Sequence, residues 1–288
     1  MATRTALAPA KVNLFLHVGP VDADGYHPLA SLVAFAGVGD RVTVAPADRL
    51  TLNVEGPFAA DLAGTDDNLV LRALRALGAA AGIGDPPLAV TLDKRLPIAA
   101  GLGGGSSDAG AALKLARDLL DLPLTDDALA DIAATIGADG PMCLHARTAW
   151  AEGRGGRLTS EPRLPPLPAL LINPGVASPT GAVYRAYDLG RPAAADRPSP
   201  PAGWSVATVI DWLASQRNDL QAPAVARAPA IGEALAAAAA LPHVRLVRMS
   251  GSGATVFALF DTLEEAARAG RKLADGRAGW WISPTRLG

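Results

Sequence analysis

The 288-residue sequence predicts an α+β protein with two lobes, and three observations point to that organisation. Strand-like and helical segments are mixed along the chain, without the strict strand–helix alternation that a parallel α/β sheet requires. Half of the residues are hydrophobic, which is enough for a large core and for two lobes. A glycine-rich stretch places the lobe boundary near residue 155, with an N-terminal lobe at 1–155 and a C-terminal lobe at 156–288.

The first half combines strands that alternate polar and apolar residues with segments of helical spacing. Helices are expected at 68–83, from Ser106 onward, and at 125–137, the last with Thr125 or Asp126 as N-cap and Gly137 as its end. The expected strands of this half are 11–18, 41–46, 50–56, 88–97, 142–146 and 148–153.

The second half contains buried strands, several helices and one Pro/Ala-rich segment. That segment, 191–203, is expected to be an exposed, mobile loop, and two or three helices should follow it. A helix at 262–274 should begin with Thr262 as cap and Glu265 completing a capping box. The expected strands are 169–175, two strands joined by a turn within 244–260, and 279–285.

The bulk composition excludes several classes of protein. The net charge is −2, so nothing suggests a nucleic-acid partner. One cysteine, Cys143, excludes an internal disulfide and fits a reducing compartment. Lys11 and Asn13 interrupt the N-terminal apolar stretch, which argues against a signal peptide, and no apolar run is long enough to span a membrane. We expect a cytoplasmic protein, a monomer or weak homodimer, that acts on a small molecule.

The stretch "LPIAAGLGGGSSDAGAALKLARDL", residues 96–119, predicts a phosphate-binding loop at a helix start. Glycines let a ligand approach the backbone closely, and a helix N-terminus offers unpaired N–H groups and partial positive charge. A plain flexible connection is the alternative, but it rarely needs three consecutive glycines followed by two hydroxyls. The expected nucleotide-binding residues are Pro97, Ile98, Ala99, Ala100, Gly101, Leu102, Gly103, Gly104, Gly105, Ser106 and Ser107.

Neither common phosphate loop fits this stretch. A Walker loop needs a lysine before the hydroxyl residue, and Ser106 follows Gly105 directly. In the dinucleotide fingerprint the third glycine would fall on Ser106, and no acidic residue follows a second strand to hold a ribose.

"PIAAGLGGGSSDA" instead resembles the nucleotide loop of the galactokinase, homoserine kinase, mevalonate kinase and phosphomevalonate kinase (GHMP) family. "APAKVNLFLHV" at 8–18 is similar to that family's first motif, and "MSGSGATVFALF" at 249–260 to its third, a turn that packs beside the phosphate loop. The resemblance covers almost the whole chain. It implies a two-lobed GHMP-kinase-like fold with the active site in the cleft between lobes, and ATP with Mg²⁺ as cofactors.

One branch of the family fits best, whose members phosphorylate a small molecule with a diphosphocytidyl group and an erythritol part. Gly140 stands where this branch usually has valine, which could loosen the loop holding Asp139, and Gly110 stands where alanine is commoner. The segments that carry this resemblance are "DADGYHPL" at 22–29, "IGADGPMCL" at 136–144, "NPGVASPTGAVY" at 173–184 and "RNDL" at 217–220.

The resemblance also assigns the chemistry. Asp139 matches the catalytic aspartate, which accepts the hydroxyl proton, and Lys11 matches the lysine that stabilises charge on the phosphoryl oxygens. Asn13 is expected to orient the acceptor. Without the resemblance, Asp139 reads as an ordinary turn aspartate and Lys11 as a surface lysine on an edge strand.

Tyr26, His27 and Tyr184 match positions that hold the cytidine, although "DGYHPL" alone is equally typical of a turn with exposed aromatic residues. Ser106 and Ser107 are expected to cap the helix and contact phosphate or magnesium. No metal-binding residue is assigned, because no His/Cys cluster has ligand spacing and no carboxylate is a clear Mg²⁺ ligand.

Two other functions stay open. One is another small-molecule kinase of the family, of the homoserine or mevalonate type, against which the "ADGYH" segment argues. The other is a non-catalytic ligand sensor on the same fold, which could lose the lysine or the aspartate, whereas both are present here.

Overall fold

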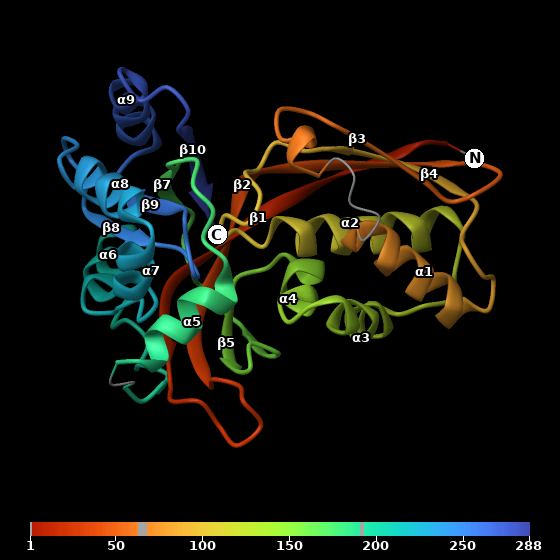
Figure 1. Ribbon diagram of the computed structural model, residues 1–288, viewed down its shortest axis with the longest axis horizontal. Helices are drawn as coiled ribbons and strands as arrows, with labels where there is room; N and C mark the ends of the chain where they lie inside the picture. The colour runs from red at the N-terminus through yellow and green to blue at the C-terminus, as the bar shows by residue number, and fades with distance from the viewer. Residues whose placement is uncertain (1, 63–67, 191–192) are drawn as a thin grey trace. The chain divides into compact units, whose positions relative to one another are not determined.

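The computed structural model (Figure 1) describes residues 2–62, 68–190 and 193–288. The chain forms two compact units that are interleaved along the sequence. Unit 1 comprises Met1–Ala10, Val38–Ile98 and Gly103–Ala146, and unit 2 comprises Lys11–Gly37, Ala99–Leu102 and Arg147–Gly288. The lobes expected from the sequence, 1–155 and 156–288, are each one continuous stretch of the chain. Their assignment of site residues to the two lobes stays a prediction.

Unit 1 contains a small mixed sheet. Strand β2 (Leu29–Pro46) pairs antiparallel with β4 (Leu88–Asp93), which in turn pairs in parallel with β3 (Thr51–Glu55). Strand β1 (Arg4–Val18) also pairs with β2, and both β1 and β2 contribute residues to both units. Side-chain burial alternates along β3 and β4, whereas β1 and β2 contain runs of consecutive buried residues.

Four helices pack on one face of the β3–β4 part of this sheet (Figure 1). They are α1 (Leu69–Ala81), α2 (Gly104–Leu119), α3 (Asp126–Ile136) and α4 (Gly140–His145), and a 3₁₀ turn, η1, spans Ala59–Leu62. The core of unit 1 joins strand residues to helix residues: Val42, Val44, Leu88, Val90, Leu92, Leu74, Leu77, Leu113, Leu119, Leu129 and Leu144.

Unit 2 contains an antiparallel arrangement centred on β7 (Leu167–Asn173). Strands β9 (Val256–Leu259) and β10 (Trp281–Leu287) pair with β7, and β8 (Leu246–Met249) pairs with β9. Strand β10 also reaches β2, where Leu287 lies opposite Ala36. The hairpin of β5 (Ala149–Gly153) and β6 (Arg157–Ser160) pairs with β2 through β5.

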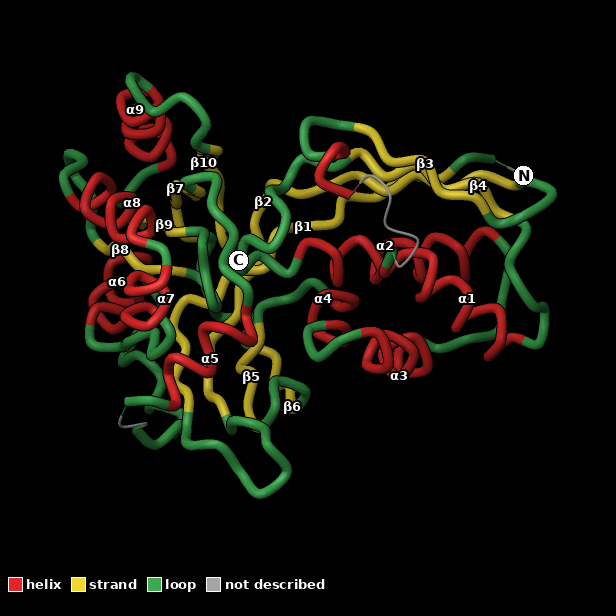
Figure 2. Tube along the Cα trace, in the orientation of Figure 1, coloured by secondary structure: helices red, strands yellow, loops and turns green. Residues whose placement is uncertain are grey.

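Helices of unit 2 lie beside these strands (Figure 2). Thr262 accepts a hydrogen bond from Glu265 N, and the Glu265 side chain accepts from Thr262 N, which confirms the predicted capping box. The helices are α5 (Thr180–Asp188), α6 (Val206–Ala214), α7 (Gln221–Arg227), α8 (Pro229–Ala239) and α9 (Leu263–Ala274).

The α+β class is confirmed, and so are the caps of α3, where Thr125 accepts from Ala128 N and Gly137 follows the last turn. The strand expected at 142–146 is wrong, because this segment belongs to helix α4. Its apolar run is too short to distinguish the two structures, and Met142, Cys143 and Leu144 are all buried in the helix.

The Pro/Ala-rich segment is described from residue 193; residues 191 and 192 of the predicted loop lie outside the described part. Residues 193–203 form neither helix nor strand. Two hydrogen bonds connect this segment to other parts of unit 2. Trp212 Nε1 donates to Ser199 O at 2.9 Å, and Arg217 donates to Ala194 O at 3.0 Å. Across the described ranges, none of the helices combines the length and apolarity needed to cross a bilayer.

Candidate active site

The part of the glycine-rich loop in unit 1 is the start of helix α2. The helix begins at Gly104, and Gly103 occupies the N-cap position with a φ of 61°, a left-handed conformation that favours glycine. Ser106 and Ser107 lie inside the first turn, and neither side chain caps the helix, so the predicted capping role is wrong. Ser107 is buried, and its hydroxyl has no hydrogen-bond partner among the described residues.

Residues Ala99–Leu102 of the loop belong to unit 2 and are held by the Gly-rich turn that follows β8. Ser250 Oγ donates to Gly101 O at 3.1 Å, and Thr255 N donates to Ala100 O at 3.1 Å. A Cβ atom on Gly101 would lie 2.6 Å from Ser250 O, so only glycine fits there. The family's third motif thus contacts the loop, as the resemblance implied.

Lys11 and Asn13 come together on β1. Leu102 O accepts a hydrogen bond from Lys11 N at 2.7 Å, which ties this strand to the loop. The Lys11 ammonium donates to Asn13 Oδ1 at 3.0 Å, and Asn13 Nδ2 donates to Ser31 Oγ at 2.8 Å. Lys11 is only 5% exposed, so the surface-lysine alternative does not describe it.

Asp139 stands at the N-cap position of α4 in unit 1, where its carbonyl accepts from Cys143 N at 3.0 Å. The backbone beside it is tightly packed. A Cβ atom on Gly140 would lie 2.0 Å from Ala133 O on α3, and one on Gly110 would lie 2.8 Å from Leu144 Cα. The expectation that Gly140 loosens this loop is therefore wrong, because glycine here permits close contact between neighbouring helices.

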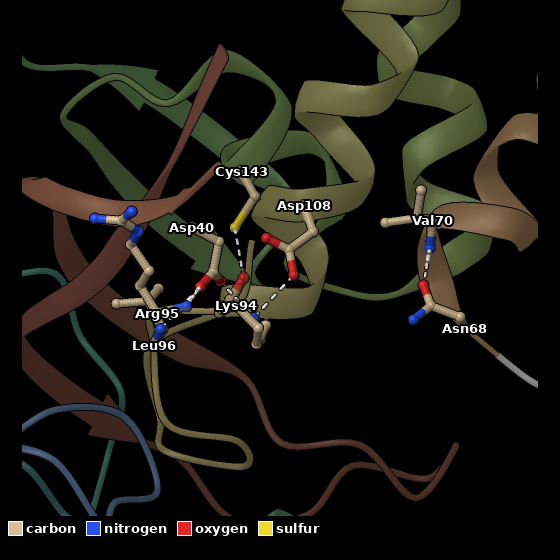
Figure 3. A network of polar contacts seen from close by, with 9 residues as sticks. Asp40, Asn68, Val70, Lys94, Arg95, Leu96, Asp108 and Cys143 are labelled. Atoms are coloured by element: carbon tan, nitrogen blue, oxygen red, sulfur yellow. Dashed lines mark hydrogen bonds and ion pairs between the residues drawn. The ribbon is translucent and has the colours of Figure 1, made fainter. Parts of the chain in front are cut away.

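Cys143 is buried, as expected for a packing residue, and its thiol donates to Gly103 O at 3.8 Å. The contact links α4 to the N-cap of α2 (Figure 3). Together with the close approach of Gly110 to Leu144, it holds the helix that follows Asp139 against α2.

A buried ionic cluster beneath the start of α2 was not anticipated from the sequence (Figure 3). The Lys94 ammonium lies between two carboxylates: it donates to Asp40 Oδ2 and, at 2.9 Å, to Asp108 Oδ2. Asp40 Oδ1 also accepts from the backbone N–H groups of Arg95 and Leu96, at 2.6 and 2.8 Å. We call Asp40, Lys94 and Asp108 the Lys94 cluster.

Burial and mutual charge determine the ionisation of the Lys94 cluster. Burial raises the pKa of the Asp108 carboxyl to about 7, although the neighbouring Lys94 ammonium partly opposes the shift. Burial also acts to lower the pKa of Lys94, but the charges of Asp108 and Asp40 outweigh it and the net shift is upward. Lys94 is therefore a firmly charged cation, and Asp108 is the group whose proton is exchangeable near neutral pH.

Tyr26, His27 and Tyr184 all lie in unit 2. The ring centroids of His27 and Tyr184 are 5.0 Å apart, so the structure brings these two predicted residues together. His27 Nδ1 donates to Gly19 O at 2.8 Å, and its Nε2 lies 3.3 Å from Asp188 Oδ1. Asp188 was not anticipated from the sequence.

Tyr26 is 56% exposed, and one face of its ring is covered by the Arg154 guanidinium at 4.2 Å. Arg154 also binds Asp24 at 2.6 Å and Asp22 at 3.2 Å. No motif in the sequence pointed to Arg154, because the residues it joins are about 130 positions away. The opposite face of the Tyr26 ring is the one that could stack on a base.

Taken unit by unit, the described residues offer three chemical capabilities. The start of α2 has backbone N–H groups with no side chains at Gly103–Gly105, which fits a polyphosphate. Lys11 provides a fixed cation. The aromatic rings beside His27 suit a planar base. Among the described residues, no group of three or more His, Cys, Asp or Glu side chains could hold a metal ion.

Comparison with known proteins identifies the class. Residues 68–147 match the model of the GHMP kinases N terminal domain, and residues 207–277 match the model of the GHMP kinases C terminal domain. The fold is also similar to that of the Methanococcus jannaschii mevalonate kinase, with a TM-score of 0.66 at 12% identity over 100% of this chain and 99% of that one.

Proteins with higher sequence identity indicate the branch of the family to which the chain belongs. The chain is 54% identical over 286 residues to the 4-diphosphocytidyl-2-C-methyl-D-erythritol kinase of Caulobacter vibrioides, covering 98% of this chain and 99% of the relative. It is 48% identical to the kinase of the same name from Xanthobacter autotrophicus, covering 100% of both. A crystal structure of 4-(cytidine 5'-diphospho)-2C-methyl-D-erythritol kinase matches with a TM-score of 0.80 at 36% identity over 99% of each chain.

The chain belongs to the GHMP kinase family, in the branch of the 4-diphosphocytidyl-2-C-methyl-D-erythritol kinases.

Proposed function

We propose that the chain transfers the γ-phosphoryl group of ATP to the 2-hydroxyl of 4-diphosphocytidyl-2-C-methyl-D-erythritol, a step of non-mevalonate isoprenoid precursor synthesis. The observation that carries the proposal is the loop at Ala99–Leu102, which is held between β1 and the Ser250 turn and leads into the glycine start of helix α2. The names of the relatives support the choice of acceptor.

In the proposed mechanism Asp139 accepts the proton of the attacking hydroxyl, and Lys11 stabilises the negative charge that develops on the phosphoryl oxygens. Asn13 holds the Lys11 ammonium at 3.0 Å and so positions it. Tyr26, Tyr184 and His27 bind the cytosine. Mg²⁺ would accompany ATP and neutralise phosphate charge, and we assign none of the described side chains to it.

The proposal includes a cytoplasmic enzyme that works as a monomer or weak homodimer. A coupled ADP-release assay tests the reaction with four acceptors: the diphosphocytidyl methylerythritol, homoserine, mevalonate and galactose. We expect turnover with the first alone. Turnover with homoserine or mevalonate instead would support the other family kinases, and nucleotide binding without turnover on any acceptor would support a ligand sensor.

A further inference from the structure

We propose that the Lys94 cluster positions the phosphate loop and that Asp108 takes up a proton when the nucleotide binds at the start of α2. The inference rests on the proposed function, because it requires that ATP binds there. It adds a role for Asp108 and a coupling between its protonation and ATP binding. The phosphoryl-transfer reaction itself needs neither.

The position of the cluster is the first step of the argument. A Cβ atom on Gly104 would lie 3.1 Å from Lys94 Nζ and 3.6 Å from Asp40 Oδ2, so the cluster lies directly against the first turn of α2. Lys94 follows the last residue of β4, and Asp108 belongs to α2 (Figure 3). The ammonium therefore fastens the strand before the loop to the helix after it, and the loop's two ends are fixed together.

The charge of the cluster is the second step. Two carboxylates share one ammonium, which leaves a net charge of −1 when both are ionised. All three side chains are almost completely buried, so water screens this charge poorly. A polyphosphate at the start of α2 would meet an uncompensated negative charge, unless the cluster bound a proton.

The hydrogen bonds indicate which carboxylate takes the proton. Both oxygens of Asp40 have partners, because they accept from Lys94, Arg95 N and Leu96 N. Asp108 Oδ2 accepts from Lys94, but Asp108 Oδ1 is buried and has no partner within the described part of the chain. An unpartnered buried carboxylate oxygen is costly when charged and is the natural place for a proton.

The other elements packed against α2 do not supply a competing charge close to Asp108. The charged residues of α1 and α3 are exposed, and Lys94 and Asp40 dominate the electrostatic environment of Asp108. From α4, which begins after Asp139 and ends at His145, the titratable group beside the N-cap of α2 is the Cys143 thiol. Burial places the pKa of Asp108 at about 7, so added phosphate charge raises it through the physiological range.

Calorimetry of ATP binding to the full chain tests the proposal. Titrations at one pH near 7.5 in buffers of different ionisation enthalpy give the number of protons exchanged. We expect uptake of about half a proton per nucleotide if binding raises the pKa of Asp108 by about one unit. Uptake should disappear as the pH is raised well above that shifted value, and ATP affinity should fall over the same range.

Asp108→Asn should remove this uptake, whereas Asp118→Asn, an exposed aspartate on the same helix, should retain it. Equal uptake in the wild type and in Asp108→Asn would overturn the proposal, because the proton would then come from ATP or another group. Should Asp108→Asn fail to fold, the wild-type titrations decide, since ATP binding without proton uptake would also overturn it. A wild-type chain that does not bind ATP at all would refute the proposed function itself.

Discussion

Asp139 lies at the N-cap of a short helix whose backbone is packed against α3, so its side chain starts from a fixed main-chain position. If it is the general base, Asp139→Asn should lower kcat by about a hundredfold or more, because the amide keeps the shape but cannot accept the proton. The KM values should change little. Steady-state kinetics with both substrates measure this effect.

Asp118→Asn serves as the matched control for the same loss of charge at an exposed site. Turnover of Asp139→Asn within a fewfold of the wild type would remove the base assignment and leave catalysis to phosphate positioning.

If Tyr26, His27 and Tyr184 bind the cytosine, single substitutions should change recognition of the acceptor. Tyr184→Ala and Tyr26→Ala should each raise KM for the cytidylylated acceptor about tenfold and leave KM for ATP unchanged, because stacking on a base is worth about 1–3 kcal/mol. His27→Ala should in addition weaken discrimination between cytosine and uracil. Michaelis constants and melting temperatures of the variants give the answer.

Tyr187→Phe is a suitable comparison, since it removes only the hydroxyl that donates to Val18 O in the same aromatic group. Equal changes in both KM values, or a loss of stability with no effect on the acceptor, would identify these aromatic residues as structural.

At the scale of elements, Gly140 tests how closely α3 and α4 pack. The resemblance to the branch implies valine at position 140, and restoring a family residue commonly stabilises a protein. Here Gly140→Val should instead destabilise it by about 1–3 kcal/mol or more, because the side chain would overlap Ala133 of α3. Thermal unfolding followed by circular dichroism measures the loss.

Gly156→Ala provides the control, since a Cβ atom there meets nothing within 4 Å. A Gly140→Val protein as stable as the wild type would mean that α3 can withdraw from α4 at little cost.

The elements also show where the sequence was informative. Local signals predicted the caps of α3 and α9, because a cap depends on residues three or four positions apart. Residues 29–40 of β2 gave no strand signal, since they are mostly buried and lack the polar–apolar alternation of a one-sided strand. The Lys94 cluster could not be predicted from local sequence patterns, because Asp40 and Lys94 are 54 positions apart and come into contact only in the folded chain.

For the whole molecule, two buried titratable groups predict how stability depends on pH. Burial lowers the pKa of His17 below 6.5, so the unfolded chain binds the proton first and stability falls as the pH drops below that value. Hydrogen bonds from Arg163, with help from Trp150, lower the pKa of Glu161 below 4.5. Its contribution is present above that pH and is lost as the pH falls through the lowered value.

Protonation of Asp108 favours the folded chain as the pH falls through about 7, so the contribution of Glu161 is measured as the difference between a variant and the wild type at the same pH. Glu161→Gln should be less stable than the wild type at neutral pH, and the difference should narrow in acid. A difference that stays constant from neutral to strongly acidic pH would show that Glu161 acts through packing alone.

The pairing of β2 with β10 has a consequence for how the chain is made. Besides the Leu287–Ala36 pair, the backbone of Phe35 exchanges two hydrogen bonds with Gly288, at 3.3 and 3.0 Å. A ribosome synthesises β2 among the first residues and β10 some 240 residues later, so this edge of β2 stays open throughout translation. An apolar strand with an unpaired edge invites association with other nascent chains. The pairing of Phe35 and Ala36 with this strand can therefore form only after β10 has been synthesised.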